Sequence, residues 1–306
     1  MSASFALALQ AARDAAAGQH YPQSTLYMVA TPIGNLADIT LRALHVLQLV
    51  DAVACEDTRH TQALLRAYGI DKPAASLMAL HQHNESQAAQ QVVQRLRQGQ
   101  RVAYASDAGT PGVSDPGARL AAAVRAEGLR CVPLPGASSV TAALSVAGAV
   151  APQAQESGFV FAGFLPARGA ERVAALQKLA LDGRCVLLLE APHRIRELAQ
   201  ALGTLGTRPV TLARELTKQF EEISTHAAQD LLPWLDGAPQ RARGEFIVLL
   251  HPAQPREDES AGQDVLRLLL QELPTKAAVR LAAQITGSSR NALYAAALQI
   301  KGDAGD

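Results

Sequence analysis

The chain has 306 residues, of which 48% are hydrophobic and 18% charged, a composition that excludes a disordered protein. This length is more than one hydrophobic core usually serves, so we expect two domains and a small appendage. The 28 basic residues equal the 28 acidic ones, so a contact with nucleic acid would need a local basic surface. No segment approaches the roughly 20 apolar residues needed to cross a bilayer, and we expect a cytoplasmic protein without membrane contact.

The first 24 residues are rich in alanine and end in the breaker-containing GQHYPQS. They predict an N-terminal extension that is either loosely helical or disordered.

Short apolar runs then alternate with helical patterns, which predicts an α/β domain over residues 25–150. Three of the helical patterns end at Gly69, Gly99 and Gly128, the residue type that commonly caps a helix. Strands alternating with helices of this length indicate a mostly parallel sheet covered on both faces. The expected strands are 26–31, 51–56, 76–81, 101–106 and 129–134.

A polar, proline-containing stretch at 149–158 predicts a domain boundary. A second α/β pattern follows over 157–252, and a charged linker then leads to three short helices within 258–306. The last two helices join through Thr-Gly-Ser-Ser, a turn that suits a helix-turn-helix but also a simple packing appendage. In the second domain we expect helices at 169–181 and 193–202, and strands at 158–163, 185–190, 209–215 and 245–250.

Four expected strands of the first domain end in loops rich in Pro, Gly, Ser and Thr. Ligands of open α/β sheets gather at the carboxyl ends of the strands, so these loops predict one shared crevice. No G-x-G-x-x-G or G-K-[ST] pattern is present, which argues against dinucleotides and nucleoside triphosphates. A phosphate-free ligand with adenosine and amino-acid ends fits better. The four loops are TPIGNL (31–36), EDTR (56–59), SDAGTPG (106–112) and PGASS (135–139).

His81 and His83 lie two residues apart at the end of a strand and could share a metal ion only if the backbone bends there. No Cys or Asp nearby completes a ligand set, so we expect no metal site. A hydrogen-bonding cluster or an edge that faces RNA is the better interpretation.

Seven segments between Leu26 and Leu250 resemble the tetrapyrrole methylase superfamily, and more narrowly its ribosomal RNA branch. Small-molecule members carry Gly-Asp-Pro where this chain has Gly109-Thr110-Pro111, which favours the RNA branch. The segments are TPIGNLADITLRAL, CEDTRHTQALL, SDAGTPGVSDPG, PGASSVTAAL, EAPHRI, RELTKQFEE and GEFIVLL.

This resemblance implies two α/β domains of the tetrapyrrole methylase type with a small C-terminal helical domain. It also implies a homodimer that holds S-adenosylmethionine in the cleft between the α/β domains. The expected reaction is methylation of the ribose 2′-hydroxyl of cytidine 1402 in the 16S rRNA of the small ribosomal subunit. Two other functions stay open: a methylase of small tetrapyrroles, and a ribosome-binding assembly factor without catalysis.

The resemblance also places residues around the methyl donor. Gly109, Thr110 and Pro111 are expected near its methionine end, with Ser138 and Ser139 close by. The other expected donor residues are Pro32 and Gly34 after the first strand, and Ala191 and Pro192 above the adenosine.

On the acceptor side, Glu56 or Asp57 is expected to be the general base or to orient it, and Arg59 to hold a phosphate. A structural Asp57–Arg59 ion pair is the alternative. Lys218 is a rival base if burial lowers its pKa, although Glu215, Glu221 and Glu222 would favour its charged form. Arg194 and Arg214 are expected to add phosphate contacts.

Overall fold

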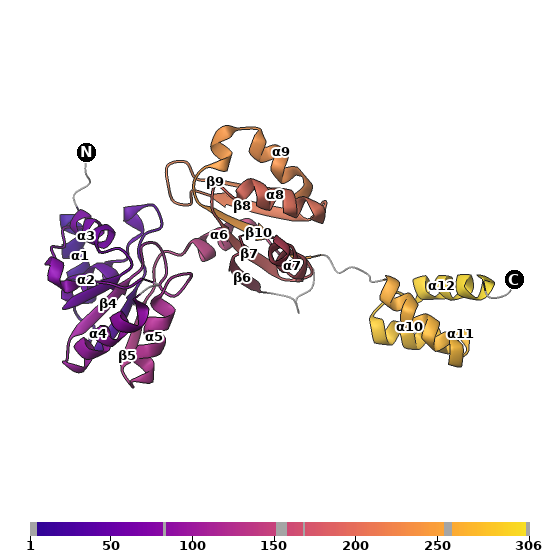
Figure 1. Cartoon of the computed structure of the whole chain (residues 1–306), viewed down its shortest axis with the longest axis horizontal. Helices are drawn as coiled ribbons and strands as arrows, with labels where there is room; N and C mark the ends of the chain where they lie inside the picture. Colours follow the sequence, from indigo (N-terminus) through magenta and orange to yellow (C-terminus); the bar gives the residue numbers. More distant parts are fainter. Residues whose placement is uncertain (1–4, 82–83, 151–157, 168, 254–258, 304–306) are drawn as a thin grey trace.

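The computed structural model describes residues 5–81, 84–150, 158–167, 169–253 and 259–303 (Figure 1). Its first sheet has five strands and is parallel, as the alternating pattern predicted, and the strand order is β3-β2-β4-β1-β5. The strands are β1 (Thr25–Val29), β2 (Ala52–Cys55), β3 (Leu77–Ala79), β4 (Arg101–Ala105) and β5 (Arg130–Leu134). The helices are α1 (Ala6–Ala16), α2 (Leu41–Leu49), α3 (Thr58–Ala67), α4 (Glu85–Arg97) and α5 (Gly117–Ala126).

Helices cover both faces of this sheet because its strands alternate side chains between two apolar clusters. Ala103 and Ala105 of β4 join a core with α1, α2 and α3. Val102 and Tyr104 of the same strand join a core with α4 and α5 on the opposite face. The strands are therefore buried on both sides, which leaves their carboxyl ends as the accessible edge.

The three glycines expected to cap helices do so in the left-handed conformation. Gly69, Gly99 and Gly128 have φ values of 77°, 83° and 71°. Each follows the end of a helix, at the position where the left-handed turn favours glycine. The helix ends read from the sequence are confirmed.

The described part of the N-terminal extension, from residue 5 onward, contains the helix α1, which packs closely, so neither a loose helix nor disorder describes it. Ala12 and Ala16 are fully or almost fully buried against α2. The Phe5 ring meets Tyr68 edge to face, with centroids 5.0 Å apart. Small alanines let α1 approach the core, a contact that composition alone does not reveal.

The second sheet is mixed, in the order β6-β7-β10-β8-β9. β6 and β7 are parallel, whereas β10 runs antiparallel to β7 and β8, and β9 runs antiparallel to β8. The sequence did not reveal β9. The strands are β6 (Phe159–Phe164), β7 (Cys185–Glu190), β8 (Pro209–Arg214), β9 (Glu222–Ala227) and β10 (Phe246–Leu250).

One face of the second sheet is covered by α7 (Gly169–Ala180), α8 (Ile195–Leu202) and α9 (Leu231–Asp236). The other face packs against α6 (Ser139–Ala147), through Val140, Ala143 and Ala147. The predicted boundary at 149–158 had placed α6 with the first sheet. In the structure the chain changes sheets earlier, between β5 and α6, because the apolar side of α6 fits the second sheet.

Three C-terminal helices pack on one another around Leu266, Ala282 and Ala297. They are α10 (Glu259–Glu272), α11 (Thr275–Thr286) and α12 (Arg290–Asp303). Gly287, in the turn between the last two, has a φ of 73° and ends α11 as the sequence suggested. None of the helices in the described ranges has the length and apolar character that a bilayer crossing needs.

Candidate functional site

The four loops expected to share a crevice are joined by hydrogen bonds at the carboxyl edge of the first sheet. Thr31 and Gly109 exchange two backbone bonds of 3.0 Å, which link the loops after β1 and β4. The Thr110 hydroxyl donates to the Ala137 carbonyl at 3.0 Å and so links the loop after β4 to the one after β5. The Asp107 N–H donates to Glu56 Oε1 at 3.3 Å and links it to the loop after β2.

A cavity of about 440 Å³ lies between these loops and the second sheet. Such a volume falls in the range of roughly 300–1,000 Å³ that is usual for small-molecule sites. We define the first wall as Ile33, Glu56, Ala108, Val113, Ser114 and Asp115. We define the second wall as Phe164, Leu189, Glu190, Ala191, Pro192, Ala213, Leu216, Glu245, Phe246 and Ile247. Ser139 and Val140 of α6 complete the lining.

The loop after β4 is shaped by the Asp115 carboxylate. Asp115 Oδ1 accepts the Gly117 N–H at 2.6 Å and the Tyr104 hydroxyl at 3.1 Å, and Oδ2 accepts the Gly112 N–H at 2.9 Å. Ser114 beside it has a φ of 67°, a conformation that costs energy for any residue other than glycine. A strained backbone held by one carboxylate next to a cavity is typical of a functional loop.

Glu56 lines the cavity and has no ion-pair partner among the described residues. Burial raises the pKa of its carboxyl, and the nearby carboxylates of Asp107 and Asp115 raise it further, against the opposing hydrogen bond from Asp107. A carboxylate with a raised pKa is a better proton acceptor near neutral pH.

Asp57 and Arg59 form the structural pair that we considered as an alternative. Asp57 is the N-cap of α3, and its Oδ1 accepts the Arg59 N–H at 2.8 Å. Hydrogen bonds from the Arg59 backbone and side chain lower the pKa of Asp57. The Arg59 side chain is 91% exposed and contacts Asp57 Oδ2 at 3.4 Å. Neither residue lines the cavity, and Asp57 is a weaker base than Glu56.

Lys218 is held as an ammonium and is unsuited to act as a base. Its Nζ lies 2.9 Å from both Glu215 Oε1 and Glu245 Oε2. Burial acts to lower the pKa of Lys218, but the bonds to these two carboxylates outweigh it and the pKa is raised. The sequence correctly predicted that Glu215 favours the charged form of Lys218. The second carboxylate beside Lys218 is that of Glu245, where we had expected Glu221 and Glu222.

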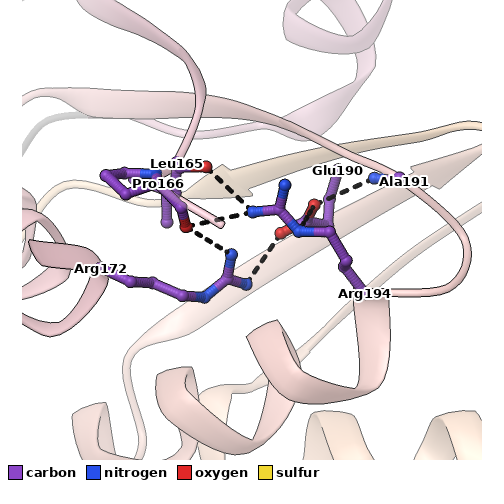
Figure 2. Close-up of polar contacts among 6 residues, drawn as sticks. All are labelled: Leu165, Pro166, Arg172, Glu190, Ala191 and Arg194. Carbon is purple, nitrogen blue, oxygen red and sulfur yellow. Dashed lines mark hydrogen bonds and ion pairs between the residues drawn. The ribbon is translucent and has the colours of Figure 1, made fainter. Parts of the chain in front are cut away.

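Arg194 and Arg214 are engaged inside the protein. Arg194 Nε lies 3.2 Å from Glu190 Oε1, and its Nη2 donates to the Leu165 carbonyl at 2.9 Å (Figure 2). Arg214 is 7% exposed and its Nη2 donates to Glu222 Oε2 at 3.1 Å. The exposed fraction of the side chain is 18% for Arg194 and 8% for Arg214, against 91% for Arg59, so Arg59 is the most accessible of the three expected RNA contacts.

Of the expected donor residues, Ser139, Ala191 and Pro192 line the cavity directly. Pro32 and Gly34 flank the lining residue Ile33, and Ser138 precedes Ser139 as the N-cap of α6. Gly109, Thr110 and Pro111 follow the lining residue Ala108, and Gly109 has a φ of 81°. The structure thus brings all the expected donor loops to one cavity.

The histidine pair can be described only in part, because His83 lies outside the described residues. The His81 N–H donates to Asn84 Oδ1 at 2.8 Å, and Asn84 Nδ2 donates to the Ala79 carbonyl at 2.9 Å. This agrees with a hydrogen-bonding cluster. Within the described ranges no three His, Cys, Asp or Glu side chains are arranged to hold a metal ion.

Sequence reasoning missed Glu190 and Arg172, which form a buried ion pair at the second wall (Figure 2). Glu190 had one available signal, since a carboxylate that ends the apolar strand CVLLLE is unusual inside a protein. No sequence signal pointed to Arg172, because it lies in a helix of both polar and apolar residues. Glu245 was missed because its cation, Lys218, is distant in sequence.

Comparison with known proteins assigns most of the chain to one family. Residues 25–232 match the model of the Tetrapyrrole (Corrin/Porphyrin) Methylases, and residues 256–301 match the model of the RsmI C-terminal HTH domain. The chain is 45% identical over 297 residues to "Ribosomal RNA small subunit methyltransferase I" of Neisseria meningitidis serogroup B, covering 96% of this chain and 98% of the relative. It is 44% identical over 284 residues to the protein of that name from Escherichia coli O157:H7, covering 92% and 96%.

Solved structures share the fold at low sequence identity. A cobalt precorrin-4 methyltransferase of cobalamin biosynthesis has a TM-score of 0.54 at 19% identity, covering 76% of this chain and 97% of its own. Uroporphyrin-III C-methyltransferase from Thermus thermophilus, in complex with S-adenosylhomocysteine, has a TM-score of 0.52 at 16% identity, covering 74% and 96%.

Proposed function

The chain belongs to the tetrapyrrole methylase family, and from this premise we propose that it transfers a methyl group from S-adenosylmethionine to a ribose 2′-hydroxyl of small-subunit ribosomal RNA. The proposed acceptor is cytidine 1402 of 16S rRNA. One observation carries the choice of RNA over a tetrapyrrole. The likeness to the rRNA methyltransferases spans nearly the whole chain, including the three C-terminal helices.

The cavity suits a methyl donor that has no phosphate. The loops approach one another closely: a Cβ at Gly136 would lie 2.8 Å from the Ala30 Cβ, and one at Gly109 would lie 3.2 Å from Ile33 Cγ2. Backbone N–H groups, hydroxyls and small side chains can bind the carboxylate and the adenine of such a molecule. Bound there, the donor would supply an activated methyl group on its sulfonium.

Glu56 is the general base of this proposal. Its carboxylate would accept the proton of the 2′-hydroxyl while the ribose oxygen attacks the methyl carbon and the carbon–sulfur bond breaks. A base of this kind contributes about 10²–10⁴-fold to the rate. The two walls contribute by holding donor and acceptor in line, which can be worth more, with effective molarities of roughly 10⁵–10⁸ M.

Arg59 is the proposed phosphate contact on the acceptor side. It is almost fully exposed at the start of α3, three residues beyond Glu56. Its guanidinium can bind a phosphate oxygen next to the target ribose while Asp57 keeps the helix capped.

We further propose that the active form is a homodimer in the cytoplasm. Sedimentation of the purified protein would test the dimer.

The deciding experiment uses labelled S-adenosylmethionine and small ribosomal subunits from cells that lack the modification. We expect label on one ribose of 16S rRNA, at cytidine 1402. Label on a porphyrinoid supplied in parallel would favour the small-molecule function. Binding to subunits without any label transfer would favour the assembly factor, and either result would overturn the proposal.

A further inference from the structure

A buried ion-pair network lies directly behind the second wall, at the carboxyl end of β7 (Figure 2). Glu190 Oε2 accepts from Arg172 Nη2 of α7 at 2.8 Å. Glu190 Oε1 lies 3.2 Å from Arg194 Nε at the start of α8, and also accepts the Ala191 N–H at 3.0 Å. The exposed fractions of these side chains are 0% for Glu190, 8% for Arg172 and 18% for Arg194.

The two arginines also bind the turn that follows β6. Arg172 Nη1 donates to the Pro166 carbonyl at 3.2 Å. Arg194 Nη2 donates to the Leu165 carbonyl at 2.9 Å and to the Pro166 carbonyl at 3.2 Å. One carboxylate therefore links two turns that are 24 residues or more apart in sequence, and Figure 2 shows both guanidiniums between them.

Both turns carry residues of the second wall. Phe164 lines the cavity immediately before Leu165, and Ala191 and Pro192 line it immediately after Glu190. Glu190 itself is 3% exposed while its side chain is fully buried, so the part that meets the cavity is main chain. The carboxylate thus supports the wall from behind and does not reach the ligand.

This arrangement is costly for stability alone. Removing three charged groups from water costs several kcal/mol per ion before their attraction is counted, and apolar residues of similar size often stabilise a fold as well. What the network provides, and apolar packing would not, is a fixed direction for the Ala191 N–H and for two backbone turns.

We propose that Glu190 is a positioning residue for the methyl donor, which it serves by fixing the Phe164 and Ala191–Pro192 parts of the second wall through Arg172 and Arg194. This inference rests on the proposed function in one respect: the cavity must be the donor site. Loss of the network should reduce the free energy of donor binding by more than it reduces the free energy of unfolding.

The test compares Glu190→Gln with Asp182→Asn in the full chain. Asp182 also pairs with an arginine, Arg184 at 2.8 Å, but lies at the opposite end of β7 from the cavity. Calorimetry with S-adenosylhomocysteine gives the Kd, and denaturant unfolding gives the stability of each variant. For Glu190→Gln we expect the Kd to rise about tenfold, whereas Asp182→Asn should leave it unchanged.

Kinetics add a measurement that a purely structural role would not change in the same way. In Glu190→Gln the KM for S-adenosylmethionine should rise about tenfold, while kcat at saturating donor changes less than about threefold. If the variant does not fold, Arg172→Lys takes its place. It keeps both charges, but lysine lacks the planar fork that bridges Glu190 and the Pro166 carbonyl.

The proposal would be overturned if Glu190→Gln folds and binds the donor with the Kd of the unaltered protein. If that variant does not fold, the same result for a folded Arg172→Lys would overturn it. An equal rise of the Kd in Asp182→Asn would also overturn it, because the effect would then be general to the sheet. If the unaltered protein binds no S-adenosylhomocysteine, the donor site itself is wrong, which is a failure of the proposed function and not of Glu190 alone.

Discussion

The two walls of the cavity hold their carboxylates in opposite ways. On the first wall Glu56 and Asp115, with Asp107 behind them, bond to backbone N–H groups and to the Tyr104 hydroxyl. None of the three forms an ion pair with a cation of the described residues. On the second wall Glu190 is paired with two arginines, and Glu245 with Lys218.

The consequence for proton affinity is opposite on the two sides. Burial and neighbouring carboxylates raise the pKa of Glu56. Beside the second wall, burial acts to raise the pKa of Glu215, but the bonds from Lys218 and the Glu245 backbone outweigh it and the pKa is lowered. The first wall is therefore the better place for the proton acceptor that we propose, whereas the second wall gives a fixed surface.

The largest expected effect is that of Glu56→Gln. Without a carboxylate to accept the 2′-hydroxyl proton, kcat should fall by about 10²-fold or more, with residual activity from alignment. In the unaltered protein the rate should fall as the pH drops through the raised pKa of Glu56, and this acid limb should be absent in the variant. Single-turnover rates across pH provide the measurement.

Stability serves as the control for Glu56→Gln. Because the pKa is raised in the folded protein, Glu56 stabilises the fold fully below its unfolded pKa, and this contribution is lost as the pH rises through the folded value. At neutral pH the variant should therefore be at least as stable as the unaltered protein in denaturant unfolding. An inactive variant that is also unstable would point to a structural role and break the comparison.

The next effect concerns Gly34, at the point where the loop after β1 meets the segment that follows β8. A Cβ there would lie 2.5 Å from Lys218 Cγ and 3.1 Å from the Leu216 carbonyl. Overpacking of this kind costs roughly 1–3 kcal/mol. We expect Gly34→Ala to push the walls apart and raise the Kd of S-adenosylhomocysteine about tenfold, the equivalent of 1.4 kcal/mol.

Gly203→Ala is the matched control, because no atom lies within 4 Å of a Cβ at that position. Both variants should be purified and titrated by calorimetry under identical conditions. An unchanged Kd in Gly34→Ala would mean that closure of the walls does not contribute to donor binding.

Arg59→Ala should have a smaller effect, confined to RNA. Loss of one phosphate contact should weaken binding of small-subunit RNA a few-fold at low salt, and reduce the slope of log affinity against log salt by about 1. Arg66→Ala is the control, since Arg66 is exposed on the same helix α3 but near its far end. Equal slopes for the two variants would remove Arg59 from the proposed RNA contacts.

The sequence predicted those parts of the fold that depend on local pattern. The five strands of the first sheet and the caps at Gly69, Gly99 and Gly128 follow from periodicity and backbone conformation. β9 was missed because its residues alternate between exposed and partly buried, as expected for an edge strand. The place of α6 depends on which sheet its apolar face meets, which no local pattern specifies.

The sequence predicted which loops form the site, but not which side chains bond to one another there. Ligand-binding edges follow from topology, which placed the loops of Glu56 and Ser139 in advance, whereas Ala191 and Pro192 were placed by the resemblance to the family. The burial of Arg194 depends on Glu190 and on two carbonyls of a distant turn. Whether an arginine meets solvent or a buried carboxylate is decided by tertiary packing, so Arg194 and Arg59 looked alike in the sequence.

The smallest expected effect distinguishes Asp57 from its neighbour Glu56. Asp57 caps α3, and the hydrogen bonds from Arg59 lower its pKa, so its contribution to stability is present above the unfolded pKa and lost as the pH falls through the folded one. Asparagine caps helices about as well as aspartate, so Asp57→Asn should keep kcat within about threefold at neutral pH. Asp57→Ala, which removes the cap, should lower stability more than it lowers kcat. If Asp57→Asn instead lost as much activity as Glu56→Gln, the proton acceptor would be the exposed cap and not the buried carboxylate, and burial would no longer explain why the first wall carries the chemistry.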